Sequence, residues 1–272
     1  MVSVMARIGL INAAVAVLAA TGALVGGVVA TAEPGTAIPQ YAALGDSYAS
    51  GVGTRTYYSS SGSCYRSPYA YAALDAARVG ASLTFNACSG ASVADVRNNQ
   101  MTGLTSTTKW VTVQVGGNDA GFSSVITACA EPFWLGDCND AVAEAQDIIR
   151  NTLPGRLDAL YNTIRSHATA AKVIVVGYPR LFNGDDCNAA TFFSPHDESI
   201  LNQTADLLDN TINGRAAAHG FAFVNPESAF IGHAVCDKAE WINGLSRPVM
   251  ESYHPNTGGQ AAYADLVDAD LM

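Results

Sequence analysis

Four short motifs in this chain contain residues whose side chains or backbone could carry acyl-transfer chemistry. Ser47 completes a Gly-Asp-Ser motif directly after an apolar run, and Gly90, Asn118 and His254 lie in turn-like stretches farther along the chain. A serine hydroxyl becomes a good nucleophile when a base accepts its proton and donors stabilise the developing oxyanion. An imidazole can serve as that base, and an amide N–H can serve as such a donor. The chain therefore contains the residue types that nucleophilic catalysis by serine requires.

Each motif also has an ordinary structural interpretation when it is taken singly. In that interpretation Ser47 does no more than cap a turn. The pairs at residues 89–90 and 117–118 are likewise common in turns. The Gly-x-Ser-x-Gly pattern of another serine-hydrolase class fits poorly, because Ala49 occupies its last glycine position. The remaining histidines are interpreted as residues near helix ends or in loops, and they are His167, His196, His219 and His233.

Apolar runs alternate with helical patterns between these motifs. Such alternation predicts right-handed crossovers and a parallel sheet that is covered by helices on both faces. The run at residues 173–176 is apolar at every position, as expected for a strand buried on both sides. The sequence therefore predicts an α/β fold, a three-layer α/β/α sandwich with about five parallel strands. The expected strands are residues 41–44, 82–85, 110–115, 173–176 and 221–224.

The helical patterns have recognisable starts and ends. Ser-Pro at residues 67–68 and Ser92 are typical of helix starts, and Gly220 ends the longest pattern. Pro154 separates two helices, because proline breaks the interior of a helix. The expected helices are residues 69–77, 93–101, 139–151, 154–168, 198–219 and 256–271.

Residues 1–32 have the pattern of a secretory leader. Arg7 precedes an uncharged stretch at residues 8–30, and a small-residue exit ends at Ala32. The alternative is a retained membrane anchor, because the stretch is long enough to span a bilayer. Its composition is only mildly apolar and no basic stop follows it. The sequence therefore predicts a cleaved leader, an extracellular protein without a stable membrane anchor, and one domain over residues 33–272.

Composition and cysteine content limit the possible partners. Lys and Arg total 14 against 24 Asp and Glu, so the net charge of −10 and the lack of a basic cluster disfavour nucleic acid. An even number of cysteines in an exported chain predicts disulfides, although spacing alone leaves their pairing open. Metal ligation is disfavoured because Cys-x-x-Cys and His-Glu-x-x-His motifs are lacking, so neither metal nor cofactor is expected. The cysteines are Cys64, Cys88, Cys129, Cys138, Cys187 and Cys236.

The motifs at Ser47, Gly90, Asn118 and His254 together resemble the four blocks of the SGNH (GDSL) hydrolases, in the family's order. The resemblance covers essentially the mature chain and is strongest to the secreted actinobacterial lipase and esterase branch. It implies a flavodoxin-like SGNH hydrolase fold and ester hydrolysis without a cofactor, through an acyl-enzyme intermediate. It also implies three disulfides paired in sequence order, which would be Cys64–Cys88, Cys129–Cys138 and Cys187–Cys236.

The resemblance also implies a role for each motif residue. Ser47 would attack the ester carbonyl, and His254 would take its proton and return it to the leaving alcohol. The backbone N–H groups of Ser47 and Gly90 and the side-chain amide of Asn118 would form the oxyanion hole.

One position departs from the family pattern. Members with a full triad usually carry aspartate three residues before the histidine, whereas this chain has Glu251 there. Glutamate reaches farther by one methylene, and some secreted relatives use a backbone carbonyl instead. The group that orients His254 is therefore expected to be either the Glu251 side chain or the Ser252 carbonyl.

The implied substrate is a lipid or small ester, met by a monomer at a lipid–water interface. Lipid acyl esters are the leading class, either triacylglycerols or phospholipids cut by a phospholipase A at the sn-1 position. A carbohydrate acetylesterase or a thioesterase is the alternative, since one fold hosts many acyl specificities. A catalytically silent secreted binding domain is an alternative of a different class, and the presence of all four motif residues disfavours it.

Overall fold

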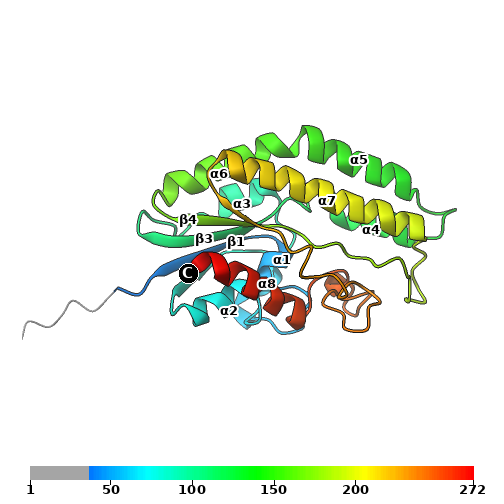
Figure 1. Ribbon diagram of the computed structural model, residues 1–272, viewed down its shortest axis with the longest axis horizontal. Coiled ribbons are helices and arrows are strands. Elements are labelled where there is room, and N and C mark those ends of the chain that lie inside the picture. Colours follow the sequence, from blue (N-terminus) through cyan, green and yellow to red (C-terminus); the bar gives the residue numbers. More distant parts are fainter. Residues whose placement is uncertain (1–36) are drawn as a thin grey trace, which may run out of the picture. The chain divides into compact units, whose positions relative to one another are not determined.

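A computed structural model describes residues 37–272, and the expected leader at residues 1–32 lies outside the described residues. The sheet has five parallel strands in the order β2-β1-β3-β4-β5 (Figure 1). This order is that of flavodoxin-like doubly wound sheets, so the expected α/β sandwich is confirmed. The strands are β1 (Gln40–Gly45), β2 (Ser82–Phe85), β3 (Thr108–Gln114), β4 (Lys172–Val176) and β5 (Ala222–Val224).

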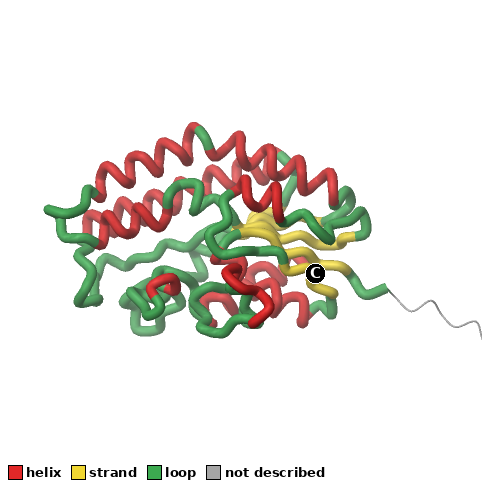
Figure 2. The backbone as a smooth tube through the Cα atoms, turned by 180° about the vertical axis from the view of Figure 1, so that it is seen from behind, coloured by secondary structure: helices red, strands yellow, loops and turns green. Residues whose placement is uncertain are grey.

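Two layers of helices cover the sheet. α2 and α8 pack together on one face, and α3 to α7 form the layer on the other (Figures 1 and 2). Because both faces are covered, the central strands are buried along nearly their whole length. The helices are α1 (Ser47–Ser50), α2 (Tyr71–Arg78), α3 (Val93–Asn99), α4 (Phe122–Ala130), α5 (Cys138–Asn151), α6 (Leu153–His167), α7 (Pro195–Ala218) and α8 (Thr257–Leu271), with 3-10 turns η1 (Ser59–Cys64) and η2 (Val249–Glu251).

Most predicted helices agree with the structure to within a few residues. Pro154 lies in the first turn of α6, directly after the end of α5, as its sequence position predicts. The helix expected from Ser67 begins only at Tyr71, because the Ser67 hydroxyl oxygen accepts hydrogen bonds from the Tyr69 amide and the Thr54 hydroxyl. Those bonds stabilise a turn in place of the first helical residues.

Helix α4 has no counterpart among the predicted helices. It begins after Gly121, whose left-handed φ of 77° provides the cap without any side-chain hydrogen bond. A capping side chain is the usual sequence signature of a helix start, and this helix lacks one.

The six cysteines form three disulfides, and their pairing is the sequence-ordered one that the resemblance implies. Cys129–Cys138 joins the last turn of α4 to the first residue of α5, and Cys187–Cys236 joins two loops. The disulfides are Cys64–Cys88, Cys129–Cys138 and Cys187–Cys236.

Among residues 37–272, no helix is both long and apolar enough to cross a bilayer.

The disulfides should differ in how much they stabilise the fold. Cys187 and Cys236 are separated by 49 residues, and Cys129 and Cys138 by 9. In the chain-entropy account, replacing the first pair by serine lowers the free energy of unfolding by about 4 kcal/mol, and replacing the second by about 2.5 kcal/mol. Urea unfolding of the two double variants measures both values. Equal losses would contradict this order.

Candidate active site

The predicted site residues lie at the carboxyl edge of the sheet, beside its topological switch point. The chain leaves β1 toward β2 on one side and then returns to β3 on the other, so a crevice forms between the ends of β1 and β3. Ser47 follows β1 by two residues, and Asn118 follows β3 by four. Both therefore lie where open α/β sheets place their ligands.

A hydrogen-bonded pair of side chains occupies this crevice. The Ser47 Oγ lies 2.8 Å from the His254 Nε2, and the His254 Nδ1 lies 2.8 Å from the Ser252 carbonyl oxygen. A carbonyl can only accept, so Nδ1 carries the ring proton and donates it to Ser252. The lone pair of Nε2 is then left to accept the Ser47 hydroxyl proton.

The His254 imidazole is strongly biased toward its neutral form. Burial of the ring disfavours the charged form and lowers its pKa to about 4, while the hydrogen bond to the Ser252 carbonyl opposes that shift. At neutral pH the ring is therefore neutral, and its Nε2 is able to accept a proton.

The Glu251 carboxylate makes no hydrogen bond to His254. Its carboxylate accepts a 2.7 Å hydrogen bond from the Tyr57 hydroxyl and lies 3.4 Å from the Arg55 Nε. Of the two orienting groups that the sequence left open, the backbone carbonyl of Ser252 is the one bonded to the imidazole.

The backbone around Ser47 is held by close contacts that sequence reasoning missed. Gly45 has a φ of 136°, and a Cβ there would lie 2.2 Å from the Gln114 carbonyl oxygen, so only glycine fits. The buried Gln100 amide bonds both the N–H and the C=O of Gly45, at 2.8 and 2.9 Å. In the sequence, nothing distinguishes Gln100 from a surface glutamine.

Asp46 caps the short helix that Ser47 begins. Its carboxylate accepts hydrogen bonds from the Tyr48 amide at 2.9 Å and the Tyr178 hydroxyl at 2.5 Å. Burial raises the pKa of Asp46 to about 7, and both hydrogen bonds oppose the rise. These bonds hold the Asp46 side chain in the turn. The Ser47 hydroxyl is therefore bonded to His254 and not to Asp46.

The loop that carries His254 is fixed to the Ser47 loop by three contacts. The Tyr48 hydroxyl donates to the Tyr253 carbonyl at 2.7 Å, and the Asn243 amide donates to the Gly53 carbonyl at 2.9 Å. A Cβ at Gly53 would lie 2.5 Å from the Pro255 carbonyl oxygen, so the backbones approach as closely as a glycine permits.

The residues expected to form the oxyanion hole have hydrogen-bonding capacity to spare. Asn118 donates one amide proton to the Ala91 carbonyl at 3.0 Å, which leaves its second proton free of that bond. Within residues 37–272, no group accepts from the backbone N–H of Ser47 or of Gly90. Gly90 has a φ of 79° and open space where a Cβ would lie, so its backbone conformation, rather than crowding, favours glycine there.

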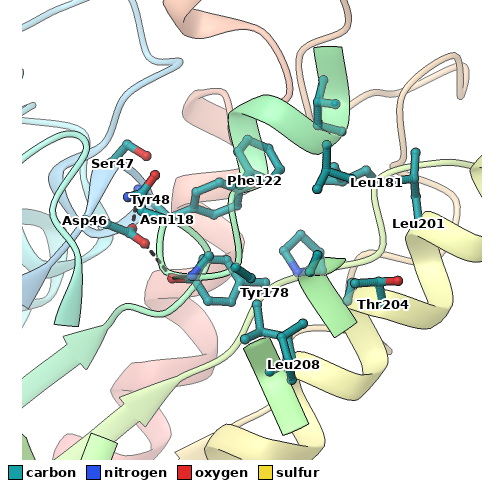
Figure 3. A pocket seen from close by; sticks show the side chains of 18 residues that line it. Asp46, Ser47, Tyr48, Asn118, Phe122, Tyr178, Leu181, Leu201, Thr204 and Leu208 are labelled. Carbon is teal, nitrogen blue, oxygen red and sulfur yellow. Dashed lines mark hydrogen bonds between the residues drawn. The ribbon is translucent and has the colours of Figure 1, made fainter. Parts of the chain in front are cut away.

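An apolar pocket leads away from Ser47 between α4, α5 and α7 (Figure 3). Ser47 and Asn118 lie at one end, and Leu201 lies toward the other. The Phe122 ring links the pocket to the dyad, since it lies edge-on to the His254 ring at 6.1 Å between centroids. The apolar lining includes Phe122, Val125, Ile126, Ala145, Ile149, Leu201 and Leu208.

One group of three potential metal ligands occurs within residues 37–272, formed by Cys187, Cys236 and Glu240. The two cysteines are joined in a disulfide, so they offer no thiolate. This group therefore does not fit a metal centre.

Comparison with known proteins identifies the family. Residues 43–262 match the GDSL-like Lipase/Acylhydrolase family. The chain belongs to this family. As a GDSL hydrolase it is an ester hydrolase, and the resemblance found in its motifs is confirmed.

Curated and solved GDSL relatives extend over most of the chain. A lipase of Streptomyces rimosus is 43% identical over 88% of this chain and 89% of its own, and Lipase 1 of Streptomyces coelicolor is 40% identical over 90% and 91%. The crystal structure of the extracellular lipase from S. rimosus has a TM-score of 0.80 at 42% identity, covering 85% of this chain and 99% of that one. The structure of phospholipase A1 from Streptomyces albidoflavus NA297 has a TM-score of 0.80 at 41% identity, covering 86% and 99%.

The low pKa of His254 can be measured directly. Burial disfavours the imidazolium, so we expect the His254 ring to remain neutral as the pH falls and to take up a proton only near pH 4. NMR of the ring nitrogens against pH, with His254→Ala for assignment, follows this step. A His254 midpoint at or above 6.5 would contradict the shift.

Proposed function

We propose that this GDSL hydrolase cleaves acyl esters of lipids, with Ser47 as nucleophile and His254 as general base. The observation that carries the proposal is the 2.8 Å hydrogen bond between the Ser47 Oγ and the His254 Nε2 at the mouth of an apolar pocket. Nucleophile, base and acyl-binding surface then lie within one crevice, as acyl transfer requires.

The reaction follows from this geometry. The Ser47 Oγ attacks the ester carbonyl carbon while its proton moves to the His254 Nε2. The oxyanion accepts hydrogen bonds from the N–H groups of Ser47 and Gly90 and from the Asn118 amide. When the intermediate collapses, His254 returns the proton to the leaving alcohol, and an acyl ester on Ser47 remains. Water, activated by the same imidazole, then hydrolyses that ester and regenerates the serine.

The Ser252 carbonyl acts as the orienting group of the dyad. It holds the Nδ1–H tautomer and faces the imidazolium that forms when the ring takes the proton. A carbonyl dipole supports that charge less than a carboxylate would, and this agrees with the depressed pKa of His254.

The pocket and the relatives together support a lipid substrate. Its lining is mainly apolar and matches an acyl chain of several carbons better than an acetyl group. Relatives are named as lipases, and one solved relative is a phospholipase A1. We therefore propose triacylglycerols or the sn-1 acyl chain of phospholipids, met at a lipid–water interface by a monomer. Structural similarity to an acetylxylan esterase, at 13% identity, shows the fold alone.

We also propose that residues 1–32 are a cleaved leader and that residues 33–272 form one extracellular domain. Three disulfides support this, because they persist in oxidising compartments outside the cytosol. A solved relative is an extracellular lipase. Sequencing the amino terminus of the protein from culture medium tests the proposed start at Glu33.

Ser47→Ala should abolish hydrolysis while the fold persists. The variant removes the attacking oxygen and makes no cavity in the apolar core, so kcat/KM on a soluble ester should fall by at least about a thousandfold. Circular dichroism checks the fold, and a fluorophosphonate probe should label the wild type alone. Near-normal turnover by the variant would refute the assignment of Ser47.

Glu251→Gln should retain most activity, whereas His254→Ala should lose nearly all of it. The Glu251 carboxylate bonds Tyr57 and lies near Arg55, so its charge does not act on the imidazole directly. We expect a loss in kcat/KM of about tenfold or less, equivalent to about 1.4 kcal/mol of barrier.

Tyr57→Phe complements Glu251→Gln, because glutamine keeps an oxygen that can accept from the Tyr57 hydroxyl, whereas phenylalanine removes the hydrogen bond itself. Tyr57→Phe should also lose about tenfold or less on one soluble ester, since Tyr57 bonds Glu251 and not the imidazole. If Glu251→Gln were as damaging as His254→Ala, the carboxylate would be a third member of a triad.

A further inference from the structure

Four large apolar side chains protrude from neighbouring loops at one end of the α4, α5 and α7 layer. Phe133, Trp134 and Leu135 are 88%, 68% and 69% exposed, and Phe192 is 55% exposed. A hydrogen bond of 3.1 Å from the Phe192 amide to the Ala130 carbonyl joins the Phe192 loop to the end of α4, where the other loop begins. We call Phe133, Trp134, Leu135 and Phe192 the apolar tip. Clustered exposure of this kind marks a site of interaction.

The loop of the apolar tip is held in shape by covalent and local bonds. The disulfide Cys129–Cys138 closes it at its base, where α4 ends and α5 begins. At its turn, the Leu135 amide donates to the Pro132 carbonyl at 2.8 Å. The loop therefore presents its apolar side chains to solvent without collapsing onto the core.

The chain around the apolar tip lacks positive charge. Residues 121–149 and 181–205 contain no lysine or arginine, although both stretches contain several acidic side chains. An anionic lipid surface attracts basic segments and repels acidic ones. The charge pattern therefore favours a lipid surface of zero net charge.

The apolar tip is directly attached to the walls of the pocket beside Ser47. α4 lines that pocket with Val125 and Ile126 and ends one turn later at the tip. α5 and α7 begin at the same end of the layer and supply the other walls (Figures 1 and 3). Anchoring of the tip would hold the pocket walls against the anchoring surface.

We propose that the apolar tip inserts into the surface of zwitterionic lipid and holds the pocket of this hydrolase there. The occupant is a phosphatidylcholine-type surface, in which Trp, Phe and Leu side chains find the interfacial environment that suits them. The inference rests on the proposed function of the Ser47 site, because it assigns how that site reaches lipid.

Fluorescence of Trp134 tests insertion at this loop specifically. The chain has three tryptophans, and Trp110 is 5% exposed while Trp241 stacks on His233 at 3.6 Å between ring centroids. In the Ser47→Ala background, phosphatidylcholine vesicles should shift the emission to the blue, and lipid brominated on its acyl chains should quench it. Trp134→Phe should remove both effects. Emission of Ser47→Ala that phosphatidylcholine vesicles leave unchanged would overturn the proposal.

Activity on two substrates tests what insertion does. The triple variant Phe133→Ser/Trp134→Ser/Leu135→Ser should hydrolyse phosphatidylcholine vesicles roughly tenfold more slowly or worse. Its kcat/KM on a soluble monomeric ester should stay within about twofold of wild type, since none of the three contacts the dyad. Ile38→Ser is the matched control, because Ile38 is also 69% exposed but lies before the amino-terminal end of β1, whereas Ser47 follows its carboxyl end. It should change neither rate.

Three results would overturn the proposal. Wild-type vesicle hydrolysis by the triple variant would show that the tip is not needed, and tighter association with phosphatidylglycerol vesicles would show that the surface is not neutral. A dimer that the triple variant disrupts, with vesicle association unchanged, would assign the tip to a second copy of the chain. Failure of the proposed function is distinguishable, because wild type would then hydrolyse neither substrate while Trp134 was still quenched.

Discussion

The structure depends on one contact between residues that are 207 positions apart, the hydrogen bond between Ser47 and His254. Ser47 follows the first strand, and His254 precedes the last helix, so the whole α/β fold must form before the two meet. The parallel sheet brings the two residues near each other, because the carboxyl ends of all its strands lie at one edge. Tyr48 then fixes the His254 loop beside Ser47, since its hydroxyl donates a hydrogen bond to the backbone of that loop.

Burial has a consequence for how the dyad is assembled. Glu251 is only 2% exposed, and the partners of its carboxylate are the Tyr57 hydroxyl and the Arg55 guanidinium. A buried carboxylate is destabilising unless it is paired, so turning it toward the ring would cost it those partners. The Ser252 carbonyl accepts the ring proton and adds no charge. Glu251 is then free to bond Tyr57, which belongs to the loop after α1, so it ties the two sides of the crevice together. Glu251 thus stabilises the structure, whereas a triad would use a carboxylate at this position to orient the histidine.

The sequence predicts the sheet from local patterns, and it predicts the four motif residues because their order resembles that of a known family. Strands buried on both faces are apolar runs, and the motifs lie at strand ends or in a late loop, so their meeting follows from the parallel sheet. The role of Gln100 could not be predicted, because its partner, Gly45, is 55 residues away and both of its bonds are to backbone. The choice between Glu251 and Ser252 likewise depends on where a side chain points, which spacing does not determine.

Helix α4 and the loop after it show why an apolar pattern alone does not predict function. Val125 lines the pocket, Cys129 is buried in a disulfide, and Trp134 protrudes into solvent, within ten residues of one another. All three are apolar in composition, so hydropathy treats them alike, whereas exposure separates them completely. The helix has no side-chain cap to mark its start, since Gly121 begins it through backbone conformation. The environment of each of these positions is set largely by α5 and α7, which follow α4 in the chain, so the local sequence of α4 does not reveal it.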